Sequence, residues 1–226
     1  MPPVDDSSLV IFDLDGTLID SEPVACRALA ETLTAHDFPY DDETVMARFV
    51  GIAYSEILEI IEAEQGRALP AAFHSDIEIR VDQRFAAELR AIEGAAAMLE
   101  ALRPARCLAS NSPPDYIDRT LAQTGLDRHL PAERRFSAAM VARPKPAPDV
   151  FHHAARSCGA TSESCVVIED SEAGARGARA AGMTVLGFLG GGHIADRQGH
   201  AERLRAAGVR EVFESLDRLP ALLTAL

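Results

Sequence analysis

The sequence contains no tryptophan, and aromatic residues make up only 5% of its 226 residues. Basic residues are also scarce: 22 Lys and Arg stand against 35 Asp and Glu, which leaves a formal net charge of −13. So acidic a chain repels the phosphates of nucleic acids and of anionic membranes, and no long basic run offsets the repulsion. We therefore expect neither a nucleic-acid partner nor a membrane partner.

Apolar runs of the roughly 18 residues that a membrane helix needs are also missing. The N-terminal residues have neither the basic nor the apolar segment of a secretion signal, so a cytoplasmic location is the expectation. The four cysteines form no CxxC pair and show no metal-ligand spacing, which predicts free thiols. The sequence shows neither a heptad pattern nor an exposed apolar edge that would indicate an oligomer. A monomer is therefore the default expectation.

The length of 226 residues exceeds an average domain of about 150 and falls short of two, which predicts one domain with a sizeable insertion. Three short apolar runs, at 9–12, 107–109 and 165–168, each end abruptly in a polar residue, as strands buried on both faces do. Further strands are expected at 184–189 and 209–213. Helices are expected at 94–102, 115–123, 149–157 and 171–181. This alternation predicts an α/β fold with a Rossmann-like parallel sheet.

The segment from about residue 22 to residue 91 interrupts the alternation, because it shows helical periodicity and no convincing strand. Phe73, Ile77, Val81, Phe85 and Leu89 recur every four residues. We predict a small all-helical, four-helix domain at 21–88, inserted after the first strand. Residues 1–20 and 89–226 then form the α/β core, and the linkers lie near residues 20–21 and 88–93.

Polar side chains mark the ends of three predicted strands. Asp13, Ser110 and Asp170 all fall beyond carboxyl ends, where ligands of open α/β sheets bind. Asp13 and Asp170, with a backbone carbonyl, offer the hard oxygen ligands that suit Mg²⁺, an ion that also accepts phosphate oxygen. This pattern favours chemistry on a phosphate group.

Two further features favour a bound phosphate. Ser110 and Asn111 precede a proline-led helix, whose free N–H groups attract an anion. Lys145 is flanked by prolines, which stiffen the backbone that carries its positive charge. A metal ion and Lys145 together would offset the charge of a phosphoryl group.

The motif DxDGT, at residues 13–17, is the most specific pattern in the sequence. At average residue usage its four fixed positions match by chance in on the order of one window in 10⁵. Alone, it is also compatible with an acidic turn in which Gly16 supplies a positive φ. The other elements decide between these interpretations.

Taken in order, residues 12–18, Ser110-Asn111, Lys145-Pro146 and Glu169-Asp170 with the following residues 171–182 resemble the four motifs of the haloacid dehalogenase-like hydrolase superfamily. The resemblance spans nearly the whole chain. The helical insertion resembles the cap domain of the beta-phosphoglucomutase-like branch. Within that branch the sequence is most similar to sugar-phosphate phosphatases, including those that act on 6-phosphogluconate.

The resemblance implies a phosphoric monoester hydrolase that uses Mg²⁺ and acts on a small phosphorylated metabolite, a sugar or sugar-acid phosphate. It implies that Asp13 is the nucleophile, which forms an aspartyl-phosphate, and that Asp15 is the general acid and base. The implied metal ligands are Asp13, Asp15 through its carbonyl, and Asp170, with Glu169 in the outer shell. The implied phosphate-binding residues are Thr17, Ser110, Asn111 and Lys145.

Three other functions are alternatives to a phosphatase. A dehalogenase needs no acid at the position of Asp15, and the dehalogenase branch lacks a carboxylate there. A phosphosugar mutase would use the same core. By the resemblance, however, a mutase holds the second phosphate of its substrate with a His and an Arg, and the matching positions here are Ala25 and Tyr54. A non-catalytic module would be indicated by the loss of a core residue, and none is lost. The phosphatase is favoured, with the mutase as the alternative.

Substrate specificity is expected to depend on the cap and on the loop after the fifth predicted strand. Tyr54 and Ala53 lie in the loop at residues 51–55 of the cap segment, and His193 follows three consecutive glycines at the end of that strand. These three residues are the candidates for substrate discrimination.

Overall fold

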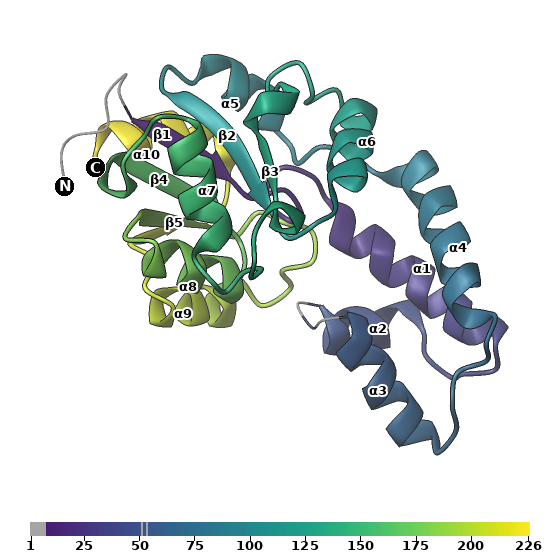
Figure 1. Ribbon diagram of the computed structural model, residues 1–226. Coiled ribbons are helices and arrows are strands. Elements are labelled where there is room, and N and C mark those ends of the chain that lie inside the picture. Colours follow the sequence, from purple (N-terminus) through teal and green to yellow (C-terminus); the bar gives the residue numbers. More distant parts are fainter. Residues whose placement is uncertain (1–7, 51, 53) are drawn as a thin grey trace. The chain divides into compact units, whose positions relative to one another are not determined.

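The computed structural model describes residues 8–50, 52 and 54–226, and this part of the chain forms two units. One unit contains the chain up to Asp20 together with Arg90–Leu226, and the other contains Ser21–Leu89. Among the described residues, all strands belong to the first unit, and the second is built of helices (Figure 1). The predicted fold class, a parallel α/β sheet with an inserted helical part, is confirmed.

The sheet unit is built on six parallel strands in the order β3-β2-β1-β4-β5-β6. Their bounds are β1 Leu9–Phe12, β2 Ala105–Ser110, β3 Arg135–Ser137, β4 Cys165–Glu169, β5 Thr184–Phe188 and β6 Glu211–Phe213. Every residue of β1 and β4 is buried, which explains why both strands are apolar apart from Glu169 at the end of β4.

The strand order reverses between β1 and β4. The chain runs outward from β1 through β2 to β3 on one side, and then from β4 to β6 on the other. Phe12, the last residue of β1, lies beside Leu108 of β2 and Ile168 of β4. Such a reversal opens a crevice at the carboxyl ends of the strands. The residues that follow β1 and β4 are therefore neighbours.

Helices cover both faces of the sheet. Their bounds are α5 Ala95–Ala101, α6 Pro114–Thr124, α7 Asp149–Ser157, α8 Glu172–Ala180, α9 Arg197–Ala206 and α10 Leu219–Thr224. Helices α7, α8 and α9 lie along the sheet (Figure 1). Their apolar side chains share one core with alternate residues of β1, β4 and β5. Helix α5 packs against α10.

The helical unit has an apolar core of its own. Its helices are α1 Ser21–Ala35, α2 Asp42–Phe49, α3 Tyr54–Gln65 and α4 Phe73–Glu88. Leu33 of α1, Ile61 of α3 and Phe73 of α4 are fully buried in this core. The side chain of Asp41 accepts a hydrogen bond from Thr44 N, 2.8 Å away, and so caps the start of α2.

The two linkers between the units pair with each other within the sheet unit. Asp20 N donates to Arg90 O at 3.0 Å, and Ile92 N donates to Leu18 O at 2.9 Å. Ile19 and Ala91 form an antiparallel bridge between these bonds. The chain therefore leaves and re-enters the sheet unit at one place.

The sequence analysis missed β3, α9 and α10. Strand β3 has only three residues, too few to show a period, and α9 (RQGHAERLRA) is mostly polar, with only Ala201 and Leu204 buried. All four cysteines are free, as expected. Among the described residues, no helix is both long enough and apolar enough to cross a membrane.

Candidate active site

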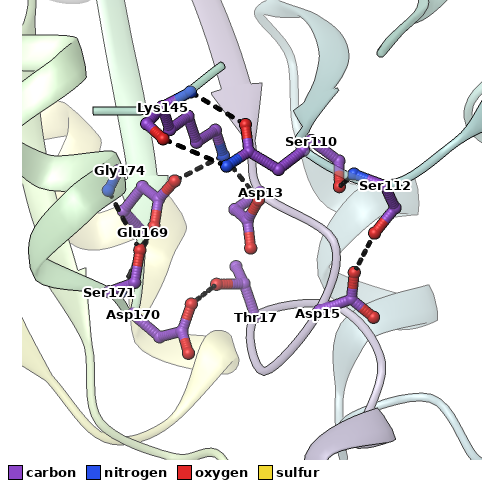
Figure 2. A network of polar contacts seen from close by, with 11 residues as sticks. Asp13, Asp15, Thr17, Ser110, Ser112, Lys145, Glu169, Asp170, Ser171 and Gly174 are labelled. Carbon is purple, nitrogen blue, oxygen red and sulfur yellow. Dashed lines mark hydrogen bonds and ion pairs between the residues drawn. The ribbon is translucent and has the colours of Figure 1, made fainter. Parts of the chain in front are cut away.

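The carboxyl ends of β1, β2 and β4 bring buried polar side chains together at one edge of the sheet (Figure 2). Charged side chains are rare in a protein interior and are buried there only when they are paired. The buried polar residues at this edge are Asp13, Thr17, Ser110, Lys145, Glu169 and Asp170. They include every strand-end residue that the sequence analysis selected.

A tight loop follows β1 and turns back on itself. Leu18 N and Ile19 N both donate to Leu14 O, at 2.9 and 3.1 Å, and Gly16 N donates to Ile19 O at 2.9 Å. Gly16 has a φ of 77°, and a Cβ atom there would lie 2.2 Å from Asp170 Oδ2. Only glycine fits this position, because the loop runs directly against a site carboxylate.

A buried ammonium joins two carboxylates at the centre of the site. Lys145 Nζ lies 2.6 Å from Asp13 Oδ1 and 2.5 Å from Glu169 Oε1. Burial raises the pKa of Asp13 well above its usual value, and nearby carboxylates add to the shift while Lys145 opposes it. Burial also raises the pKa of Glu169, and the charge of Asp170 adds to it. For Lys145, burial alone would lower the pKa, but the two carboxylates raise it.

The backbone of Lys145 is fixed by Asn111. Asn111 Oδ1 accepts a hydrogen bond from Lys145 N at 2.9 Å, and Asn111 Nδ2 donates to Lys145 O at 3.2 Å. Helix α8 packs closely beside this segment, because a Cβ atom on Gly177 would lie 3.1 Å from the carbonyl oxygens of Pro146 and Ala147. Lys145 is the only lysine in the sequence.

Glu169 is held by the first turn of α8 (Figure 2). Its Oε2 accepts hydrogen bonds from Ser171 N at 3.2 Å and from Ser171 Oγ at 2.9 Å. Ser171 also caps the helix by accepting from Gly174 N at 3.0 Å. A Cβ atom on Gly174 would lie 1.8 Å from Glu169 Oε1, so the glycine makes room for the carboxylate.

Asp170 has partners on both carboxylate oxygens and on its carbonyl. Thr17 Oγ1 donates to Asp170 Oδ1 at 3.0 Å, and His193 Nε2 lies 3.1 Å from Asp170 Oδ2. His200 Nε2 lies 2.6 Å from Asp170 O. Gly192 N donates to Asp20 Oδ1 at 2.9 Å, which ties the loop that carries His193 to the end of the first linker.

The carboxylate of Asp15 lies apart from this cluster, and Figure 2 shows it pointing toward Ser112. Ser112 Oγ donates to Asp15 Oδ2 at 2.7 Å, and Tyr116 Oη donates to Asp15 Oδ1 at 2.7 Å. The chain therefore holds Asp13 and Asp15 in different environments. Asp13 is paired with a cation, whereas the hydrogen bonds that Asp15 accepts from Ser112 and Tyr116 come from neutral hydroxyls.

The donor set fits a divalent cation. Asp13, Glu169 and Asp170 each offer a carboxylate oxygen, and these atoms lie within 4.8 Å of one another. Three carboxylates and one ammonium leave a formal excess of two negative charges in a buried place. All three ligand atoms are hard oxygens, which suit Mg²⁺. A divalent ion would balance the excess charge.

The structure brings together most, but not all, of the predicted site residues. Asp13, Lys145, Glu169, Asp170 and the hydroxyl of Thr17 are linked by the contacts above, with Thr17 bonded to a carboxylate. The roles of these residues stay predictions. Tyr54 begins α3 of the helical unit and is exposed. Ala53 lies outside the described residues.

Sequence reasoning did not select Ser112, Tyr116 or His200. Ser112 lies in the predicted loop after β2, and the other two lie in the first turns of α6 and α9. Polar residues at these places are common on solvated surfaces and carry no motif. Only the spacing of Ser112 from Ser110 offered a signal.

Comparison with known proteins identifies relatives of this chain. Residues 8–182 match the family described as haloacid dehalogenase-like hydrolase. The chain is 34% identical over 185 residues to 6-phosphogluconate phosphatase of Escherichia coli (strain K12), across 81% of this chain and 83% of that protein. It is 30% identical over 179 residues to a fructose-1-phosphate phosphatase of the same organism, across 78% of this chain and 94% of that protein.

A crystal structure with bound ions has the same fold. It is a haloacid dehalogenase family hydrolase from Deinococcus radiodurans R1 with bound phosphate and sodium. It is 32% identical to this chain, with a TM-score of 0.83, and the match covers 98% of this chain and 97% of that chain.

Proposed function

Because this chain belongs to the haloacid dehalogenase-like hydrolase family and is a phosphoric monoester hydrolase, we propose that it removes the phosphoryl group from a sugar or sugar-acid phosphate, such as 6-phosphogluconate. The observation that carries the proposal is the contact of Asp13 with Lys145, 2.6 Å apart, beside two further buried carboxylates. The names of the two Escherichia coli relatives support the substrate class.

The first half of the proposed reaction uses Asp13 as the nucleophile. A carboxylate oxygen of Asp13 attacks phosphorus, the bond from phosphorus to the leaving oxygen breaks, and Asp15 gives a proton to that oxygen. Lys145 neutralises negative charge on the phosphoryl oxygens, and Ser110 donates a hydrogen bond to them. An alcohol and an aspartyl-phosphate result.

The second half regenerates the enzyme. A water molecule attacks the phosphorus of the aspartyl-phosphate while Asp15 takes up a proton from the water. The bond between phosphorus and Asp13 breaks, and inorganic phosphate leaves. Asp13 and Asp15 end in the states in which they began.

Mg²⁺ is the proposed cofactor. Asp13, Asp170 and the carbonyl of Asp15 would hold it, with Glu169 close by, and the bound ion would draw negative charge from the phosphoryl oxygens. Thr17 and His193 orient the carboxylate of Asp170, whose oxygens they contact at 3.0 and 3.1 Å. A cytoplasmic location and a monomeric state stay predictions.

The proposal is tested by the release of inorganic phosphate. The panel contains 6-phosphogluconate, fructose 1-phosphate and a nucleoside monophosphate, each measured with Mg²⁺ and with excess chelator. Asp13→Asn serves as the inactive variant, and Asp118→Asn serves as its control, because Asp118 is an exposed partner of Arg135. We expect Mg²⁺-dependent release that Asp118→Asn keeps and Asp13→Asn loses.

Two results would contradict the proposal. Undiminished release by Asp13→Asn would remove the nucleophile from the mechanism. Conversion of a sugar phosphate into its isomer without release of phosphate would instead establish a mutase.

A further inference from the structure

Two hydroxyl groups hold the carboxylate of Asp15, one on each oxygen. Ser112 Oγ donates to Oδ2 and Tyr116 Oη donates to Oδ1, both at 2.7 Å. Rotation of the carboxylate about its Cβ–Cγ bond would weaken both hydrogen bonds at once, because they restrain its two oxygens from different elements. This pair of donors therefore restrains the orientation of Asp15.

The donors themselves are held in place by the surrounding backbone. Ser112 N donates to Ser110 Oγ at 3.0 Å, and Ser112 O accepts from Ser137 Oγ at 2.7 Å. Ser137 is fully buried on β3. Tyr116 lies in the first turn of α6, and its neighbour Ile117 anchors that turn in the core. The backbone that carries each donor is therefore held in place by buried contacts.

We propose that Ser112 and Tyr116 are positioning residues for Asp15. They hold the carboxylate in the orientation from which it delivers a proton to the leaving oxygen, and they touch no reacting atom themselves. A general acid must lie within hydrogen-bond reach of its target, and small errors in placement are costly. The inference rests on the proposed function, because it assigns to these residues a part of the acid catalysis proposed for Asp15.

The chemistry of the leaving group separates positioning from a structural role. An alkoxide is a poor leaving group and needs a proton from Asp15 as the bond to phosphorus breaks, whereas p-nitrophenolate leaves without one. The ratio kcat/KM reports the steps up to release of the leaving group, before water attacks the aspartyl-phosphate. A misplaced Asp15 therefore lowers kcat/KM for alkyl phosphates selectively. A general loosening of the site lowers it for every substrate.

The experiment compares Tyr116→Phe with the wild-type enzyme on 6-phosphogluconate, fructose 1-phosphate and p-nitrophenyl phosphate. For each substrate, the kcat/KM of the variant is divided by that of the wild-type enzyme, so that differences in binding between substrates cancel. We expect a loss of about 10-fold for the alkyl phosphates and of less than about 2-fold for p-nitrophenyl phosphate, since acid catalysis contributes about 10² to 10⁴ in total. Ser112→Ala, which keeps the backbone contacts of Ser112, is expected to show the same selectivity.

Tyr40→Phe is the matched control. Tyr40 Oη also donates to a carboxylate, Glu64 Oε2 at 2.6 Å, but within the helical unit. This variant loses the same hydroxyl group, and we expect ratios near one for all substrates. Thermal unfolding of each variant shows whether it is folded, and Ser112→Ala decides the question if Tyr116→Phe is not.

Results of two kinds would overturn the inference, one from the variants and one from the wild-type enzyme. Equal losses on alkyl and aryl phosphates, or no loss with either variant, would show that the hydroxyls do not position Asp15. A wild-type enzyme that hydrolyses none of the substrates would overturn the proposed function itself, and the inference with it. These failures are distinguishable, because only the second concerns the unmodified protein.

Discussion

Two groups of paired charges, one in each unit of the molecule, differ in their exposure to solvent. In the sheet unit, Lys145 contacts Asp13 and Glu169, and the three side chains are 4%, 11% and 0% exposed. In the helical unit, Glu31 pairs with Arg80 and Arg84 across α1 and α4, with side chains 28%, 38% and 32% exposed. The first group is enclosed by protein, and the second is in contact with solvent.

Under the proposed function, this difference separates charges that take part in the reaction from charges that stabilise the fold. Burying an ion costs several kcal/mol of desolvation free energy, and the attraction of an oppositely charged partner offsets this cost only in part. Exposed pairs cost little and stabilise little. The buried cluster therefore contributes little to stability, and the proposed reaction, which needs charged groups shielded from water, accounts for its presence in the sheet unit.

The pKa shifts of the carboxylates in these two groups have opposite signs. Burial raises the pKa of Asp13 and of Glu169, so both carboxyl groups favour the protonated form on folding. Hydrogen bonds from Arg84 lower the pKa of Glu31, so folding favours its ionised form. The contribution of the first group to stability falls as pH rises, and the contribution of Glu31 falls as pH drops.

Substitution of Lys145 by methionine is expected to have the largest effect on stability. Lys145→Met leaves Asp13 and Glu169 buried without their cation, and loss of one partner of a buried pair costs about 3 to 5 kcal/mol. The raised pKa values mean that the loss shrinks as the pH is lowered and the carboxylates take up protons. Chemical denaturation at pH 7 and at pH 5, in the presence of chelator, measures both effects.

Arg143→Met is the control for Lys145→Met. Arg143 lies two residues earlier, is 69% exposed, and pairs with Asp149. We expect it to unfold like the wild-type protein at both pH values. Equal destabilisation by the two variants would mean that the buried cluster has no special cost.

A methyl group at position 174 tests how tightly Glu169 is held. In Gly174→Ala, the new Cβ atom would lie 1.8 Å from Glu169 Oε1, so the carboxylate must move away from Lys145. Overpacking of this kind costs about 1 to 3 kcal/mol. We expect phosphate release to fall together with the midpoint of thermal unfolding.

The control for Gly174→Ala lies on the same helix. The side chain of Arg176 is 61% exposed and pairs with Glu172 of the same helix. Arg176→Ala should leave phosphate release unchanged. Unaltered activity in Gly174→Ala would show that the position of Glu169 does not matter to the reaction.

The smallest effect is expected in the helical unit. Glu31→Gln removes the partner of Arg80 and Arg84, and exposed pairs contribute about 1 kcal/mol or less. Because the pKa of Glu31 is lowered, this contribution is present above its usual pKa and is lost as the pH falls through the lowered value. Denaturation at pH 7 in low and high salt, and again at pH 3.5, measures it. A larger loss at acid pH than at pH 7 would reverse the predicted sign.

Much of the fold follows from local pattern. The run Leu9–Phe12 is buried on both sides, so its sequence alone predicts a central strand, and Asp13 follows at its carboxyl end. The periodic apolar residues of α4 likewise predict a helix with one buried face. Strand β3 and helix α9 could not be predicted in this way, because their formation depends on neighbours distant in the sequence.

The site divides along the same line. Asp13, Lys145 and Asp170 were predicted because a strand end or a motif marks each of them. Ser112 and Tyr116 were not, because their contacts with Asp15 join segments 97 and 101 residues apart. His200 reaches the carbonyl of Asp170 from the first turn of a polar helix. The contacts of these residues depend on their positions in the folded chain, which no local sequence pattern reveals.

The central claim is that the buried carboxylate of Asp13 becomes phosphorylated during turnover. The most direct test mixes the enzyme with a substrate labelled in its phosphoryl group, quenches with acid within milliseconds, and maps the label by mass spectrometry. The account predicts a transient label on Asp13 that hydroxylamine removes and that Asp13→Asn never acquires, while Asp118→Asn acquires it normally. Turnover with no label on Asp13, or a label that persists in Asp13→Asn, would contradict the account.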